Sequence, residues 1–97
     1  MRSVRNARFR KAFAKLPAKV QQIARDAYMR FRANPFDPTV KLHPIQGTRT
    51  PDVYAVDAGT HRGTAYRALG IWHKGRDVIV WFWIGSHEEY NQIIKRL

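Results

Sequence analysis

Residues 78–90 read VIVWFWIGSHEEY and combine an uninterrupted apolar run with a helix-start signal. The run from 78 to 84 places β-branched and aromatic residues on both faces, which is typical of a strand covered on both sides. Ser86, with Glu89 three residues later, matches the capping box, in which the serine hydroxyl accepts a backbone N–H and the glutamate reaches back. The stretch therefore predicts a buried strand over residues 77–84, followed by a helix over residues 87–96.

Two further strands are expected upstream, over residues 53–58 and 64–72, because both segments are rich in β-branched and aromatic residues and are bounded by glycine-containing turns. The turns between the three strands are predicted at residues 59–63 and 73–76. The apolar third strand is expected to be the interior strand of the three. One of its faces would meet helices. The other face, with Ile79, Trp81 and Trp83 or the complementary set, would need cover from the last helix, a partner or RNA bases. Residues 41–43 are expected to add a short edge strand.

The N-terminal third of the chain is expected to be helical. Phe9, Phe13 and Leu16 recur at helical spacing among basic residues that would form a cationic outer face. Pro17 interrupts this helix and suits the first turn of a second one, which ends at the proline-rich segment 34–38. The two helices would pack as an antiparallel hairpin.

These elements follow one another in the order α-α-β-β-β-α. A chain of 97 residues holds a single domain, residues 1–97. We therefore expect an α+β fold in which an N-terminal helical hairpin packs on a three- to four-stranded antiparallel sheet, with a short C-terminal helix.

The charge balance points to an anionic partner. Eighteen Lys and Arg against seven Asp and Glu give a formal net charge of +11, which favours nucleic acid or an acidic protein over an anionic membrane or a solvated surface without a partner. Without cysteine the chain has neither disulfides nor a thiolate metal site. The N-terminus lacks the apolar run of a signal peptide, and residues 78–84 are too few to span a bilayer. A soluble cytoplasmic protein is expected.

Four stretches resemble the RelE/ParE superfamily of bacterial toxins, in their order and spacing as well as in their residues. They are FRKAFAKLP at 9–17, NPFDP at 34–38, YRALG at 66–70 and WFWIGSHEEY at 81–90. The first two are ordinary helix and helix-stop sequences, and the last two are more specific. The resemblance covers nearly the whole chain and implies a RelE-like fold.

The resemblance also implies a function. Toxins of this kind generally cut mRNA on the ribosome without metal, or inhibit DNA gyrase, and each is held inactive by a cognate antitoxin, which we expect to be acidic here. Arg67 matches the arginine that mRNA-cutting members use at the scissile phosphate. His87 and Tyr90 fall where several members keep a C-terminal catalytic His or Tyr. The turn at 57–63 is longer than in the best-studied members, and no lysine pair precedes Arg67.

Arg67 is also a candidate on its own chemistry. It alternates with Ala65 and Leu69 along its strand, so it shares a face with apolar side chains, which is unusual unless an anion meets it. A phosphate would meet that need. The alternative is an internal ion pair to Asp57 or Asp77.

His87 and Tyr90 could complete an RNA-cleaving site, because cleavage without metal needs a base, an acid and a cation on the phosphate. They lie three residues apart on one helix face, so Tyr90 could orient His87 or stack on a base. Alternatively, His87 is an exposed first-turn residue and Tyr90 a core anchor. Secondary phosphate contacts are predicted at Lys41, His43, Arg62, Lys74 and Arg76, each of which is otherwise a surface charge. The four histidines lack the spacing of zinc motifs, so neither a metal site nor a cofactor is expected.

Three functions are compatible with these features. The first is an endoribonuclease acting on ribosome-bound mRNA, the second a non-enzymatic inhibitor of DNA gyrase, and the third a plain nucleic-acid-binding module. A titratable histidine beside a phosphate-facing arginine favours the first.

Overall fold

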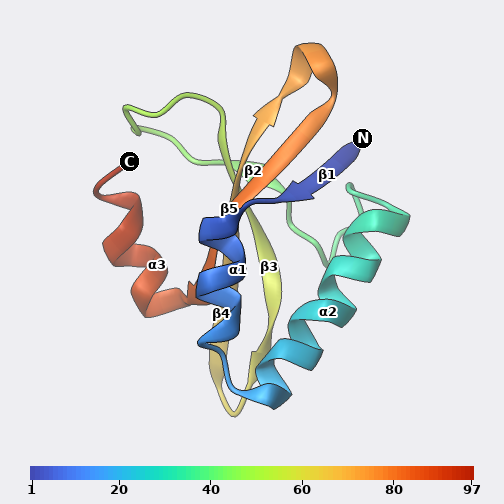
Figure 1. The fold of residues 1–97 in the computed structure, drawn as a ribbon, viewed down its shortest axis with the longest axis vertical. Helices are drawn as coiled ribbons and strands as arrows, with labels where there is room; N and C mark the ends of the chain where they lie inside the picture. Colours follow the sequence, from blue (N-terminus) through green and yellow to red (C-terminus); the bar gives the residue numbers. More distant parts are fainter.

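Five strands form one mixed sheet in the order β1-β5-β4-β3-β2, with helices on both faces (Figure 1). The computed structural model describes all residues from 1 to 97. In chain order the elements are β1 (Arg2–Arg5), α1 (Ala7–Ala14), α2 (Ala18–Ala33), β2 (His43–Pro44), β3 (Val53–His61), β4 (Thr64–His73), the 3-10 turn η1 (Lys74–Arg76), β5 (Val78–Ser86) and α3 (His87–Ile94). The α+β class and the order of the three helices and three long strands are confirmed.

The prediction of a three- to four-stranded antiparallel sheet was wrong in strand number and in orientation. β1 adds a fifth strand that runs parallel to β5, with Arg2 opposite Val78. β2 is an edge strand at His43–Pro44, where residues 41–43 were predicted. β1 has no strand pattern in its sequence because it is a short edge strand whose arginines are exposed, a composition that edges use to avoid aggregation.

The middle strand of the three long ones is β4, and the prediction that β5 takes this place was wrong. β5 becomes an interior strand of the full sheet because β1 pairs with its other edge. That pairing covers only residues 78–81. From Phe82 onward β5 has no strand partner on that side, which leaves room for a groove described below.

Helices α1 and α2 cover one face of the sheet, α1 over β5 and α2 over β3 (Figure 1). Asn6 caps α1 by accepting the Phe9 N–H at 2.9 Å. Pro17 is the N-cap of α2, one residue before the first turn in which it was predicted. The two helices run antiparallel but diverge, instead of packing closely as a hairpin (Figure 1). Beneath them lies the larger core cluster, which includes Phe9, Ala24, Phe31, Tyr54, Val56, Ile79, Trp81 and Ile84.

Helix α3 covers the opposite face of the sheet. Alternate residues of a strand point to opposite faces, so Val53 and Ala55 of β3 join a second core cluster with Leu69, Phe82 and Tyr90. The predicted capping box is present: Ser86 Oγ accepts the Glu89 N–H at 3.2 Å, and Glu89 Oε1 accepts the Ser86 N–H at 3.1 Å. None of the three helices is both long and apolar enough to cross a bilayer.

The turn between β3 and β4 is shorter than predicted. The strands continue to His61 and Thr64, and a two-residue turn at Arg62-Gly63 joins them in place of the predicted turn over 59–63. Both turn residues have positive φ, 50° and 80°, as a type I′ turn requires. Gly59 lies instead in a bulge of β3, with a φ of 102°. A glycine before a hairpin therefore marked a bulge, not the turn.

Replacing Gly59 with alanine is expected to destabilise the fold by about 1–3 kcal/mol, because alanine is strained at this φ and its Cβ would overlap with the Ile23 side chain on α2. For a domain of this size, the melting temperature falls by roughly 4–8 °C per kcal/mol. Gly63→Ala is the matched control, since Gly63 also has positive φ but open space around its Cβ position. Thermal unfolding followed by circular dichroism should show the larger fall for Gly59→Ala. Equal falls would contradict close packing of the bulge against α2.

Candidate functional site

The junction between β5 and α3 brings the three predicted catalytic residues together. Arg67 of β4 lies opposite Gly85, the last residue but one of β5, and α3 begins two residues later. Tyr90, one turn into α3, is close enough to Arg67 for the guanidinium charge to act on its phenol. The ring centroids of His87 and Tyr90 are 5.5 Å apart. We refer to Arg67, His87 and Tyr90 as the junction cluster.

The three members differ in exposure. His87 is exposed, Arg67 is half-buried, and Tyr90 is buried with 8% of its surface accessible. The only hydrogen-bond partner of the His87 ring is the side-chain amide of Asn91, 3.4 Å from Nδ1. Nε2 is therefore free to exchange a proton with a ligand.

Arg67 has no carboxylate partner within the protein. Asp57 lies directly opposite it on β3, but the Asp57 carboxylate accepts the Gly59 N–H at 2.7 Å. Asp77 pairs with the amino group of Met1 at 3.3 Å, and this is the only salt bridge of the structure. Neither ion pair considered for Arg67 forms, so its half-buried guanidinium is available to an anion from outside the chain.

The environment of Tyr90 restricts what its phenol can do. Burial raises the pKa of Tyr90 above its usual range, and the positive charge of Arg67 offsets part of this effect. The phenol therefore stays protonated at neutral pH and can donate a hydrogen bond or a proton, but it cannot accept a proton as a base. Histidine is the side chain that ordinarily titrates near neutrality, which leaves His87 as the candidate base.

The two tryptophans of β5 face opposite sides of the sheet, contrary to the expectation that they share one. A bulge at Phe82 shifts the register of β5 against β4 and reverses the alternation of faces. Trp81 is buried beneath α2, with its ring edge-on to Phe31 at 5.3 Å between centroids. Trp83 is half-buried and packs against the cluster beneath α3.

The Trp83 ring lies over the backbone of Gly85. A Cβ at residue 85 would lie 2.5 Å from this ring and 3.1 Å from a carboxylate oxygen of Glu89, so only glycine leaves room for the ring. Because Gly85 is the strand partner of Arg67, Trp83 borders the junction cluster. Sequence reasoning missed this role, since a tryptophan within an apolar strand is more often part of the core.

A groove of about 350 Å³ extends from Trp83 along α1 and passes the first turn of α3. Its lining includes basic side chains of α1 and two aromatic rings, namely Arg8, Lys11, Lys15, Tyr66 and Trp83. From the sequence these basic residues were expected on an outer helix face, with no connection to the site. The available signal was their spacing of three and four residues, which puts them on one side of a helix.

Three of the secondary phosphate candidates lie at the two ends of β4. Arg62 is in the β3–β4 turn, whereas Lys74 and Arg76 are in η1 at the opposite end (Figure 1). A strand of ten residues spans roughly 33 Å, so one short RNA segment would have to cross the whole sheet to reach all three. The Lys74 ammonium lies over the rings of Tyr54 and Trp72, 5.5 Å and 5.2 Å from their centroids.

The other two secondary candidates lie at the β2 edge of the sheet. Lys41 and His43 are both exposed, and His43 Nδ1 is 2.6 Å from the backbone oxygen of Lys41. Contact of any of the five with RNA stays a prediction. No group of three or more His, Cys, Asp or Glu side chains is arranged to hold a metal ion.

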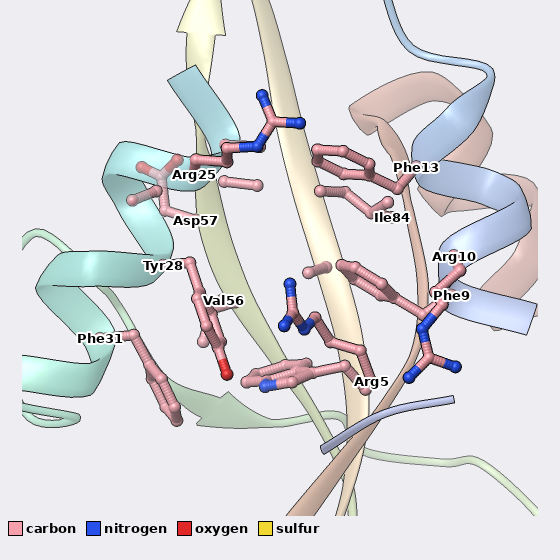
Figure 2. A pocket seen from close by; sticks show the side chains of 15 residues that line it. Arg5, Phe9, Arg10, Phe13, Arg25, Tyr28, Phe31, Val56, Asp57 and Ile84 are labelled. Carbon is pink, nitrogen blue, oxygen red and sulfur yellow. The ribbon is translucent and has the colours of Figure 1, made fainter. Parts of the chain in front are cut away.

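A second groove lies where α1 and α2 diverge (Figure 2). It has a volume of about 190 Å³, and most of its lining is apolar, including the rings of Phe13 and Tyr28. Three arginines border it: Arg5, Arg10 and Arg25. The Arg5 guanidinium lies 5.2 Å from the Tyr28 ring centroid, and that of Arg25 lies 5.2 Å from the Phe13 ring centroid. Asp57 also lines the groove, so part of the apolar core is open to the surface among three arginines and one aspartate.

Comparison with known proteins identifies the fold. No family model matches the sequence, and no curated protein sequence matches it. A double-arginine mutant of the E. coli toxin RelE in the free state superposes with a TM-score of 0.62 at 19% identity, over 99% of this chain and 96% of RelE. RelE in the intact E. coli RelBE toxin–antitoxin complex superposes with a TM-score of 0.60 at 19% identity, over 87% and 93%.

A copper-bound mutant toxin from Helicobacter pylori is also similar, with a TM-score of 0.56 at 16% identity over 92% of this chain and 97% of the toxin. Identities this low establish the fold alone. The chain has the RelE fold over nearly its full length.

Proposed function

We propose that this chain is the toxin of a bacterial toxin–antitoxin pair and that it cuts mRNA on the ribosome without a metal ion. The observation that carries the proposal is the junction cluster, in which Arg67 has no carboxylate partner and lies with Tyr90 and an exposed His87. A half-buried cation without an internal partner suits a phosphate, and a neighbouring imidazole suits proton transfer. The RelE fold supports the same function.

Each residue has a distinct task in the proposed reaction. His87 takes the proton of the 2′-hydroxyl, and the 2′-oxygen attacks phosphorus. The bond between phosphorus and the 5′-oxygen breaks, which produces a 2′,3′-cyclic phosphate and a free 5′-hydroxyl. The Tyr90 phenol, protonated at neutral pH, supplies the proton for the leaving oxygen. Arg67 stabilises the negative charge that builds on the phosphate oxygens in the transition state.

An acidic antitoxin is the proposed partner of the basic surface. The formal net charge of +11 calls for an anionic partner, and E. coli RelE has been crystallised with its antitoxin RelB. The groove between α1 and α2 suits an amphipathic helix, because apolar side chains would enter between Phe13 and Tyr28 while acidic neighbours meet the arginine rim (Figure 2).

Induced expression of the chain alone in a bacterial host is expected to stop growth within a few generations. Primer extension on a cellular mRNA should then reveal new 5′ ends within translated regions, and the purified chain should cut mRNA only on ribosomes. Co-expression with the product of an acidic open reading frame beside its gene should restore growth and yield a complex of the two proteins.

A supercoiling assay with purified DNA gyrase decides whether the chain is an mRNA-cutting enzyme or a gyrase inhibitor. Growth arrest with intact mRNA and loss of DNA supercoiling by purified gyrase would overturn the proposal in favour of a gyrase inhibitor. Normal growth with the folded chain present in good yield would remove the toxin assignment itself.

A further inference from the structure

The groove beside α1, formed by Arg8, Lys11, Lys15, Tyr66 and Trp83, is strongly basic. Its cations come from successive turns of one helix face, and none of them takes part in a salt bridge. The one acidic residue in the lining, Glu89, already accepts hydrogen bonds from the backbone and hydroxyl of Ser86, at 3.1 Å and 3.0 Å. The groove therefore has a net positive charge that no part of the chain compensates.

The three cations of the groove differ in whether they have an interaction partner within the chain. The Arg8 guanidinium lies 5.3 Å from the Phe82 ring centroid and is held there by a cation–π contact. Lys11 and Lys15 are exposed, and the ammonium group of neither has a hydrogen bond, an ion pair or an aromatic partner. These two ammonium groups are therefore the ones available to an anionic ligand.

Two aromatic rings line the groove together with these cations. Tyr66 and Trp83 are half-buried and line the groove from β4 and β5. The Trp83 ring cannot rotate freely because it lies against the backbone of Gly85. A fixed, partly exposed ring stacks on a flat ligand without first losing much rotamer entropy.

The groove lies beside the junction cluster, whose members do not themselves line it. Trp83 lines the groove and, at the same time, lies over the strand partner of Arg67. Ser86, which precedes His87, lines the groove as well. A chain molecule whose phosphate sits on Arg67 would enter this groove with its neighbouring units.

We propose that the groove beside α1 binds single-stranded RNA, with a base stacked on Trp83 and phosphates on Lys11 and Lys15. The inference rests on the proposed nuclease function and adds the path of the nucleotides flanking the cut. Stacking and phosphate contacts read no base edge, so the groove contributes affinity with little sequence preference. An acidic peptide would use the cations but would leave the rings without a flat partner.

Binding is tested with a fluorescein-labelled single-stranded RNA of about ten nucleotides whose 2′-oxygens are methylated, so that it cannot be cut. Fluorescence anisotropy over a range of salt concentrations gives the Kd and its salt dependence. Lys11→Ala/Lys15→Ala is expected to weaken binding about tenfold at low salt and to reduce the slope of log K against log salt by about 1.4, or 0.7 for each phosphate that no longer meets a lysine. Lys95→Ala/Arg96→Ala removes the same charge from the exposed end of the chain and should change the Kd less than about twofold.

Substitutions of Trp83 provide a second, independent test of the proposal. Trp83→Leu should weaken binding about tenfold because the base can no longer stack, and Trp83→Phe should restore most of it. Melting temperatures identify any variant that fails to fold, and the lysine pair keeps the proposal testable if Trp83→Leu does so.

The outcomes separate this inference from the proposed nuclease. Binding through Lys11, Lys15 and Trp83 without any mRNA cleavage by wild type would retain the groove and overturn the nuclease. Cleavage by wild type, with RNA binding unchanged in the variants, would overturn the groove and retain the nuclease. The lysine variant could also bind RNA as wild type does but fail to bind a poly-glutamate peptide. That result would make the groove a protein-docking surface and overturn the RNA assignment.

Discussion

Arg67→Ala is expected to reduce mRNA cleavage on ribosomes by roughly 10²–10³-fold and to permit normal growth of cells that express it. The reason is that Arg67 would be the cation on the phosphate whose charge increases in the transition state. Its guanidinium has no carboxylate partner within the chain, so its removal leaves no buried charge unpaired. The melting temperature should therefore stay close to that of wild type, with a change in unfolding free energy within about 0.5 kcal/mol.

Two variants sharpen this test. Arg67→Lys keeps the charge but loses the planar fork of donors, and should recover only part of the cleavage rate. Arg96→Ala removes a positive charge from the exposed C-terminal end and should cleave as wild type does. Single-turnover cleavage measures all three. Undiminished cleavage by Arg67→Ala would remove Arg67 from the phosphate site, and a large fall in its melting temperature would mean that the side chain mainly supports packing.

His87→Gln is expected to reduce the cleavage rate by roughly 10²–10⁴-fold, because glutamine can form hydrogen bonds but cannot accept the 2′-hydroxyl proton. RNA binding should barely change, since His87 is exposed and has only the contact with Asn91. Equal rates for wild type and His87→Gln would exclude His87 as acid or base.

Dependence on pH adds a signature that a structural role would lack. A base must be unprotonated to act, so the wild-type rate should rise with pH and then level off. This rise should be absent in His87→Gln. Tyr90 adds no step near neutral pH, because its raised pKa keeps the phenol protonated.

Ser86→Ala serves as the control for His87. It removes the cap of α3, in which Ser86 accepts the Glu89 N–H, and should cost about 1 kcal/mol of stability. Its cleavage rate should keep the wild-type rise with pH. A loss of that rise in Ser86→Ala would show that the orientation of α3, and not the imidazole itself, governs the reaction.

Much of the fold was predictable from local patterns. The apolar spacing around Pro17 indicated two helices, the enrichment in β-branched and aromatic residues indicated three long strands, and the capping box at Ser86 indicated α3. β1 was not predictable, because its pairing with β5 joins residues more than seventy positions apart. Ser3 secures that pairing, because its Oγ accepts hydrogen bonds from the Trp81 Nε1–H and from the Tyr28 hydroxyl, each at 2.9 Å.

The candidate site was predictable only in its residue types. Arg67, His87 and Tyr90 stood out by the resemblance and by their chemistry, but the sequence could not decide whether Asp57 or Asp77 neutralises Arg67. The answer depends on backbone geometry. The bulge at Gly59 offers its N–H to Asp57, and the register of β4 and β5 places Arg67 opposite Gly85, at the far end of the strand pair from Asp77.

By itself, then, the sequence determined the helices and the long strands, because these depend on residues a few positions apart. It also determined the basic charge and the candidate catalytic side chains, because these depend on residue identity alone. Only the tertiary structure decided the parallel fifth strand, the opposite faces of Trp81 and Trp83, the free charge of Arg67 and the groove along α1. All of these follow from strand register. A single extra residue at a bulge moves every later side chain to the other face of the sheet, and no local pattern records where that residue falls.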